Sequence, residues 1–155
     1  MRIRFFLTLV VLLNLQMIAQ KIDYKTVRDS LSVLSCGKVD SSEVVNTRNR
    51  LENFDTTQIS KNIYLYYRDL QWCYYRSYLV SKDSTFIDQS IINGKKSLIT
   101  QPYYTPALWD ITFCYFLEND CENGKYYLEE YKKSIDKKYR QQDQINRITA
   151  KCGNN

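Results

Sequence analysis

The second half of the chain carries a degenerate internal repeat of two paired elements. Trp72 and Trp109 are each followed six residues later by a short aromatic and aliphatic triplet, and the sequence Asn-Gly-Lys recurs downstream of each tryptophan. The copies differ mainly in the connection between the paired elements, which is longer in the first copy (81–89) than in the second (118–120). A repeated pair of elements whose copies differ in length only at the connection predicts a duplicated helical hairpin.

Apolar periodicity and capping signals divide the remaining chain into about seven helices. The expected ranges are 23–34, 41–54, 57–80, 86–99, 106–117, 121–136 and 138–151. No stretch shows the alternation of a β-strand, and 4 Gly with 2 Pro are too few for a turn-rich β fold. Short connections force neighbouring helices to run antiparallel. We therefore expect an all-α fold of stacked antiparallel hairpins, with residues 20–155 forming one domain.

Residues 1–19 have the layout of a secretory signal peptide. Arg2 and Arg4 precede an apolar run at 5–15, and Ala19 offers a small residue for cleavage. The run is shorter than the ~20 residues that span a bilayer. The alternatives are an uncleaved anchor or a buried first helix. We expect a periplasmic or secreted protein, bacterial by its Lys-, Asn-, Ile- and Tyr-rich composition, with no stable membrane insertion after signal removal.

Composition excludes several classes of function. The chain has no histidine, which removes the commonest general base, the usual nucleophile pairs and most zinc sites. Its formal net charge of +5 is small, and basic and acidic residues are interspersed along the chain, unlike those of a nucleic-acid-binding surface. We therefore expect a protein that is not an enzyme, binds no nucleic acid, and uses neither a cofactor nor a metal ion.

The second copy resembles a tetratricopeptide repeat over residues 106–136. Asn119 stands at the hairpin turn, where the repeat has a glycine. The other residues at signature spacing are Ala107, Leu108, Ile111, Tyr115, Asp120, Gly124 and Leu128. The resemblance implies stacked helical hairpins that bind a protein or peptide in a concave groove built by the first helix of each hairpin.

Gly94 and Gly124 occupy equivalent places in the second helix of each hairpin. A glycine inside a helix costs about 1 kcal/mol relative to alanine, so it is expected where another helix passes close by. We expect a tryptophan or tyrosine from the first helix to rest against each of these glycines.

Four residues are candidates for partner binding: Trp72, Arg76, Trp109 and Phe113. If the hairpins stack, these residues fall on corresponding groove-side positions of the two first helices. Aromatic residues and arginine dominate protein interfaces. The alternative is that both tryptophans fill the core of a short, self-closed bundle.

The chain has five cysteines, an odd number for an exported protein. Cys121 and Cys152 stand at opposite ends of two helices that are expected to run antiparallel, which favours a Cys121–Cys152 disulfide. A Cys114–Cys121 bridge across the hairpin turn is the competing pairing. Cys73 is expected to be a buried thiol.

Acidic residues around one turn raise the possibility of glycoside hydrolysis, which uses paired carboxylates. Glu118, Asp120 and Glu122 surround this turn. Capping by Asp120 and a helix-dipole interaction of Glu122 explain these residues more simply.

The sequence therefore favours an exported, non-enzymatic protein-binding module. One version is an immunity-type protein that neutralises a toxin in the periplasm, and another is an adaptor in envelope assembly. The alternative class is a small glycan-binding or glycan-hydrolysing protein.

Overall fold

The structure is a computed structural model that describes residues 21–30 and 41–152. The expected signal peptide at 1–19 and the end of the first expected helix at 31–34 lie outside the described residues. Within the described part of the chain the fold is all-α, which confirms the expected class. The helices are α2 (Tyr24–Ser30), α3 (Ser41–Glu52), α4 (Ile63–Ser81), α5 (Thr85–Thr100), α6 (Thr105–Leu117), α7 (Cys121–Ser134) and α8 (Gln142–Thr149).

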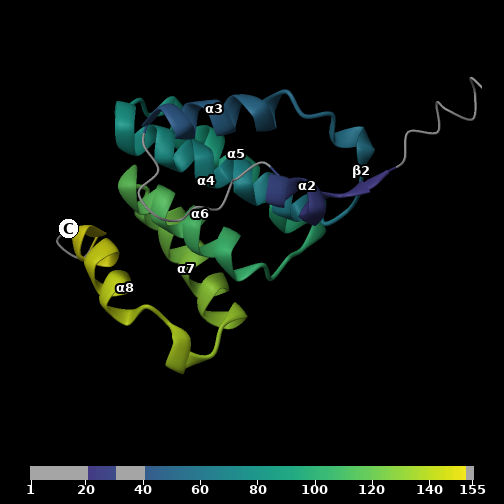
Figure 1. Cartoon of the computed structure of the whole chain (residues 1–155). Helices are drawn as coiled ribbons and strands as arrows, with labels where there is room; N and C mark the ends of the chain where they lie inside the picture. Colours follow the sequence, from purple (N-terminus) through teal and green to yellow (C-terminus); the bar gives the residue numbers. More distant parts are fainter. Residues whose placement is uncertain (1–20, 31–40, 153–155) are drawn as a thin grey trace, which may run out of the picture.

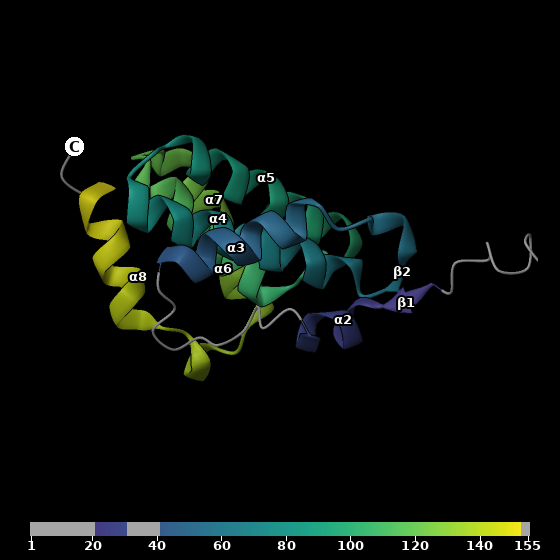
Figure 2. The same cartoon turned by 45° about the horizontal axis from the view of Figure 1, so that its top comes forward.

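Consecutive helices pack along one another (Figure 1). Helix α4 lies along α5, α6 lies along α7, and α5 also contacts α6. Helix α3 covers α4, and α2 contacts α4 at the end of the molecule that holds the small sheet. In Figure 2, α8 lies at the opposite end from that sheet, where it contacts α6.

Three hydrophobic clusters form the core. The first joins α2, α3 and α4 and includes the fully buried Tyr24 and Leu51. The second joins α5 to α6 and includes Ile91 and Ile111. The third joins α6, α7 and α8, and Ile145 is its buried residue from α8. Helix α6 thus contributes to two clusters, which fixes its position in the molecule.

The expected helix at 57–80 begins later than its apolar pattern indicated. Residues Ile59–Lys61 form strand β2, which pairs in parallel with β1 (Ile22–Asp23), and α4 starts only at Ile63. Asn62 adopts the left-handed conformation with φ 61°, which interrupts a right-handed helix. Its side-chain amide also donates a hydrogen bond of 2.9 Å to Asp23, which ties the break to β1. The sequence pattern did not indicate these two strands, which are only two and three residues long.

The expected last helix at 138–151 is also interrupted. A 3₁₀ turn at Lys137–Tyr139 precedes α8, and a second one at Ala150–Cys152 follows it. Arg140, between the first 3₁₀ turn and α8, has extended backbone. Its guanidinium donates a hydrogen bond to the carbonyl of Lys132 near the end of α7. This bond satisfies one of the carbonyl groups that every helix end leaves without a partner.

The turn between α6 and α7 uses the acidic residues structurally. Asn119 adopts the left-handed conformation with φ 61°. Asp120 caps α7, because its carboxylate accepts a hydrogen bond of 3.1 Å from the backbone N–H of Asn123. Hydrogen bonds from Asn123 hold the pKa of Asp120 below its usual value. The capping role expected for Asp120 is confirmed, and Glu122 lies in the first turn of α7.

Both helical glycines lie at close contacts, and the contact at Gly94 is the tighter one. A Cβ atom at Gly94 would lie 2.5 Å from Nε2 of Gln71 and 2.6 Å from Cγ1 of Ile111. A Cβ atom at Gly124 would lie 3.1 Å from the ring of Phe116. The nearest side chains are therefore an amide, an isoleucine and a phenylalanine, rather than the tryptophan or tyrosine that we expected.

We expect Gly94→Ala to lower the free energy of unfolding by about 1–2 kcal/mol. Overpacking typically costs about 1–3 kcal/mol, and better helix propensity returns up to about 1 kcal/mol. Gln71 yields poorly, because its amide donates a hydrogen bond of 3.2 Å to the carbonyl of Ala107. Gly124→Ala is the matched control, with a change near zero. Urea unfolding monitored by tryptophan fluorescence measures both, and equal stabilities for the two variants would contradict this packing argument.

Candidate functional site

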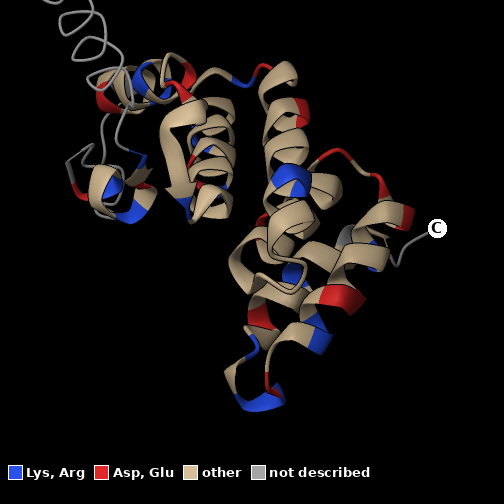
Figure 3. Cartoon of the chain, turned by 90° about the vertical axis from the view of Figure 1, so that its right-hand side faces the viewer, with Lys and Arg blue, Asp and Glu red and all other residues tan. Residues whose placement is uncertain are grey.

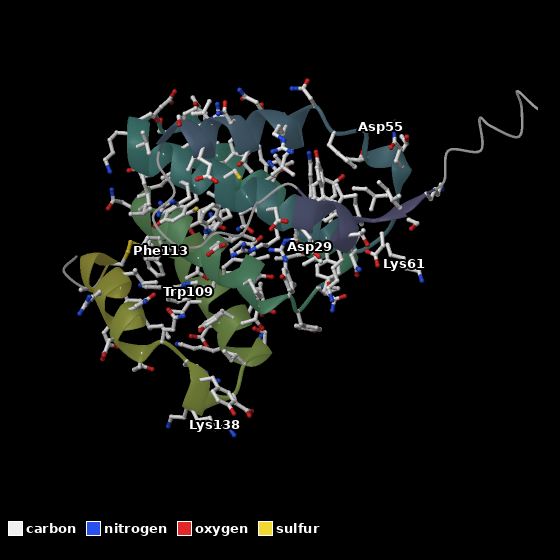
Figure 4. The ribbon with its side chains drawn as sticks, in the orientation of Figure 1. Asp29, Asp55, Lys61, Trp109, Phe113 and Lys138 are labelled. Carbon is white, nitrogen blue, oxygen red and sulfur yellow. A yellow bond between two sulfur atoms is a disulfide. The ribbon has the colours of Figure 1, made fainter. Side chains whose placement is uncertain are left out.

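A half-open cleft lies between α6 and α8, and aromatic rings form much of its wall (Figure 4). It consists of two adjoining hollows that share Phe113 and Gln144. The larger hollow, of about 410 Å³, is lined by Phe113, Phe116, Leu117, Gln144, Arg147 and Ile148. The smaller hollow, of about 150 Å³, is lined by Tyr75, Trp109, Asp110, Phe113 and Gln144. We call the two hollows together the aromatic cleft.

Helix α6 supplies the aromatic wall of the cleft. Two of its three faces pack against other helices, and the third is left to line the cleft. One face packs on α5 through residues such as Ile111, and a second packs on α7 through residues such as Leu108. Trp109, Phe113 and Leu117 follow one another at spacings of four residues and therefore share the remaining face. An almost wholly apolar helix is thus covered on two sides and lines the cleft with the third.

Helix α8 supplies the opposite wall. Its buried Ile145 holds it to the third cluster, while Gln144, Arg147 and Ile148 line the cleft. The 3₁₀ turn that follows α8 is covalently attached to the start of α7 through the Cys121–Cys152 disulfide, whose Cα atoms are 5.7 Å apart. The expected pairing is therefore confirmed.

The other described cysteines are unreactive thiols. Cys114, the competing candidate for a disulfide with Cys121, is buried and free, so that pairing is wrong. Cys73 is buried and free, as expected. Burial raises the pKa of each thiol to about 12, which leaves almost no nucleophilic thiolate near neutral pH.

The four residues expected to bind a partner fall into two separate pairs. Trp109 and Phe113 lie side by side in the aromatic cleft, with ring centroids 6.3 Å apart. Trp72 is half-buried against the first cluster, and the guanidinium of Arg76 lies 5.4 Å from the centre of its ring. Neither residue of this second pair lines a hollow of the aromatic cleft.

The two alternatives for the tryptophans, groove or core, both describe part of the arrangement. Trp109 packs on the third cluster, where its ring lies 4.9 Å from that of Tyr131, and it also lines the smaller hollow. Packing against Tyr131 fixes the orientation of the Trp109 ring, and the rest of the ring surface lines the cleft.

A line of four alternating charges connects α2 to the cleft. The fully buried Asp69 of α4 is held by Arg28 of α2, with N–O distances of 2.7 and 2.8 Å. Arg68 lies 3.8 Å from Asp69 and 3.5 Å from Asp110 of α6. Tyr24 adds a hydrogen bond of 3.3 Å to Asp69.

Among the described residues, Asp110 is the one carboxylate that lines the aromatic cleft. Its side chain is 17% exposed, and its buried Oδ2 atom accepts no hydrogen bond although it faces Arg68. Burial raises the pKa of Asp110 to about 6, and the positive charge of Arg68 offsets this effect only in part. The group is therefore mostly ionised at neutral pH without a hydrogen-bonding partner for Oδ2 in the described chain.

Other features of the described residues define the surroundings of the site. Basic and acidic residues are interspersed along the helices in the view of Figure 3. In the ranges 21–30 and 41–152, no cluster of three or more His, Cys, Asp or Glu side chains has an arrangement suited to a metal ion. Over these same ranges, no helix combines the length and apolar character needed to cross a membrane.

The sequence pattern missed Tyr75, Asp110 and the α8 residues of the cleft. Tyr75 and Asp110 stand next to the expected binding residues Arg76 and Trp109, and a neighbour on a helix normally points about 100° away. The spacing of Ile145 and Ile148 indicated a helix, but the pattern did not show against which surface that helix packs.

Comparison of this chain with protein-family models, curated proteins and solved structures finds no match in any of the three.

Proposed function

We propose that this chain is a non-enzymatic protein-binding module that holds a peptide segment of a partner protein in the aromatic cleft. The observation that carries the proposal is the position of Trp109 and Phe113. Both project from one face of a helix whose other two faces are packed, into a hollow closed by α8. Rigid aromatic residues in a pocket are the usual energetic centre of a protein interface.

The chemistry of the larger hollow indicates what fits there. Phe113, Phe116 and Leu117 from α6 and Ile148 from α8 provide apolar walls, while Arg147 and Gln144 contribute polar groups. A volume of about 410 Å³ suits one or two large apolar side chains and does not suit a folded domain. The partner therefore presents an exposed loop or an extended segment.

The resemblance to tetratricopeptide repeats supports the same proposal. In that arrangement α4 and α6 are the first helices of successive hairpins and build the groove. Tyr75 from α4 and Phe113 from α6 both line the aromatic cleft, with ring centroids 5.8 Å apart. The proposal includes this hairpin array as the scaffold of the site.

The disulfide supports export to an oxidising compartment, the periplasm or the cell exterior. Residues 1–19 would direct that export. In the specific version that we favour, the module is an immunity-type protein whose cleft captures a segment of a toxin. An adaptor in envelope assembly would use the same cleft with another partner.

We expect Phe113→Ala to weaken partner binding by at least about 30-fold, because truncating a central aromatic residue costs about 2 kcal/mol or more. The partner is first recovered from an envelope or secreted fraction, and its affinity is then measured by titration calorimetry. Tyr126→Ala is the matched control, because Tyr126 is 60% exposed and does not line the cleft. Equal affinities for the two variants would contradict the proposed site.

The same preparation tests the alternative class. Retention of the wild-type chain on a glycan resin, without a stoichiometric protein partner, would favour a glycan-binding protein. Inhibition of a purified toxin by the wild-type chain but not by Phe113→Ala would support the immunity version over the adaptor.

A further inference from the structure

Three rings wall the smaller hollow of the aromatic cleft, and none of the described residues that line it is basic. Tyr75, Trp109 and Phe113 form the walls, and Gln144 from α8 adds an amide. Tyr75 meets Phe113 edge to face, with an interplanar angle of 82°, and Trp109 is tilted by 53° to Phe113. The faces of aromatic rings carry partial negative charge and attract a cation.

Asp110 adds a negative charge to the hollow, and this charge also favours a cation. The side chain of Asp110 lines the hollow and is 17% exposed, and among the described residues Arg68 is its ion-pair partner, 3.5 Å from the buried Oδ2 atom. A carboxylate in a poorly hydrated site is strongly stabilised by a cationic donor that reaches it. Arg76 lies over Trp72, and Arg147 lines the adjoining larger hollow rather than this one.

The geometry points to a subsite for an alkylammonium group, contributed by a lysine side chain of the bound protein. The ammonium sits between the rings of Tyr75, Trp109 and Phe113 and pairs with the carboxylate of Asp110. This inference rests on the proposed function, and it assigns the kind of residue that the partner inserts beside its apolar anchor.

Size favours the end of a lysine side chain over a larger cation. A volume of about 150 Å³ is that of about five water molecules at roughly 30 Å³ each. The ammonium and its last methylene groups occupy such a space. Because the two hollows share Phe113, a peptide with a lysine near a large apolar residue fills both.

The test uses n-butylammonium chloride as the probe and n-butanol as its neutral counterpart, with sodium chloride matching the ionic strength. The indole N–H signal of Trp109 in the NMR spectrum of the full chain reports binding, and a Trp72→Phe variant assigns that signal. We expect a saturable shift with butylammonium and none with butanol at equal concentration. Equal shifts with both compounds would overturn the inference.

Asp110→Asn is expected to weaken butylammonium binding at least tenfold, with an unchanged helical circular dichroism spectrum. Asp88→Asn is the matched control, because it removes the same charge from an exposed position on α5. Phe113→Leu gives a second test that keeps apolar bulk but removes a ring face, and we expect the same loss. Binding as tight in Asp110→Asn and Phe113→Leu as in Asp88→Asn would overturn the inference.

The probe separates this inference from the proposed function. If the partner depends on Phe113 but butylammonium does not bind, only the lysine subsite is wrong. If butylammonium binds through Asp110 while partner affinity is unchanged in Phe113→Ala, the proposed function is wrong and the cation site stands. Substituting each lysine of the partner segment by norleucine then identifies the inserted residue, and one substitution is expected to weaken binding tenfold or more. If no substitution weakens binding, the assignment to a partner lysine is wrong.

Discussion

Arg28→Ala is expected to lower the free energy of unfolding by about 3–5 kcal/mol, the usual effect of removing one member of a buried ion pair. Asp69 is fully buried, and Arg28 contacts both of its carboxylate oxygens, at 2.7 and 2.8 Å. Without Arg28 the nearest remaining cation is Arg68, at 3.8 Å. Urea unfolding followed by tryptophan fluorescence measures the loss.

A second substitution shows whether the uncompensated charge causes that loss. We expect Asp69→Asn to recover more than half of the lost stability when it is added to Arg28→Ala, because the buried carboxylate is then gone. Arg50→Ala is the matched control, since Arg50 is exposed in the last turn of α3 and surface substitutions change stability by about 0.5 kcal/mol or less. If Arg28→Ala were no more destabilising than this control, the ion pair would not stabilise the fold.

The same charges connect the N-terminal segment to the cleft. Arg28 lies on α2, Asp69 and Arg68 on α4, and Asp110 on α6. A substitution at Arg28 therefore changes the charge balance around Arg68, which is the ion-pair partner of Asp110 among the described residues. Because positive and negative groups alternate along this line, their net charge is close to zero. Pairing of this kind reduces the cost of holding several ionised side chains away from water.

The helices that carry the repeat were largely predictable from the sequence. Helices α5 and α6 begin and end within one residue of the expected ranges, because short polar or proline-containing turns bound each of these apolar segments. The pairing of β1 with β2 was not predictable. The two strands are only two and three residues long, and their pairing depends on the conformation of Asn62 and its hydrogen bond to Asp23.

The candidate site was predictable only in part, because one wall comes from α6, within the repeat, and the other comes from α8, outside it. Trp109 and Phe113 were expected from their correspondence with Trp72 and Arg76 on the first helices of the two hairpins. Asp69 and Arg68 were missed, since adjacent charges within a helix normally indicate a solvated surface. The disulfide was expected from helix ends, yet the consequence that it holds α8 against the cleft required the three-dimensional structure.

Replacing both Cys121 and Cys152 by alanine is expected to lower the free energy of unfolding by about 3–4 kcal/mol. The bridge joins residues 31 positions apart, and a closed loop of this length restricts the unfolded chain by about that much. Dithiothreitol is expected to destabilise the wild-type chain to the same extent. The doubly substituted chain is the control, and a further effect of dithiothreitol on it would mean that a different bridge stabilises the protein.

Loss of the disulfide also has a local consequence that separates the cleft from the rest of the fold. Ile145 is the only buried residue of the described α8, whereas α4 to α7 share the larger clusters. Without its covalent attachment, α8 is expected to open more readily than the other helices, because few apolar contacts hold it. Hydrogen exchange should then show faster exchange in Gln142–Thr149 than in α6. Partner affinity should fall with it, since Arg147 and Ile148 leave the cleft. Uniformly faster exchange over all helices would mean that the disulfide stabilises the whole domain rather than this wall.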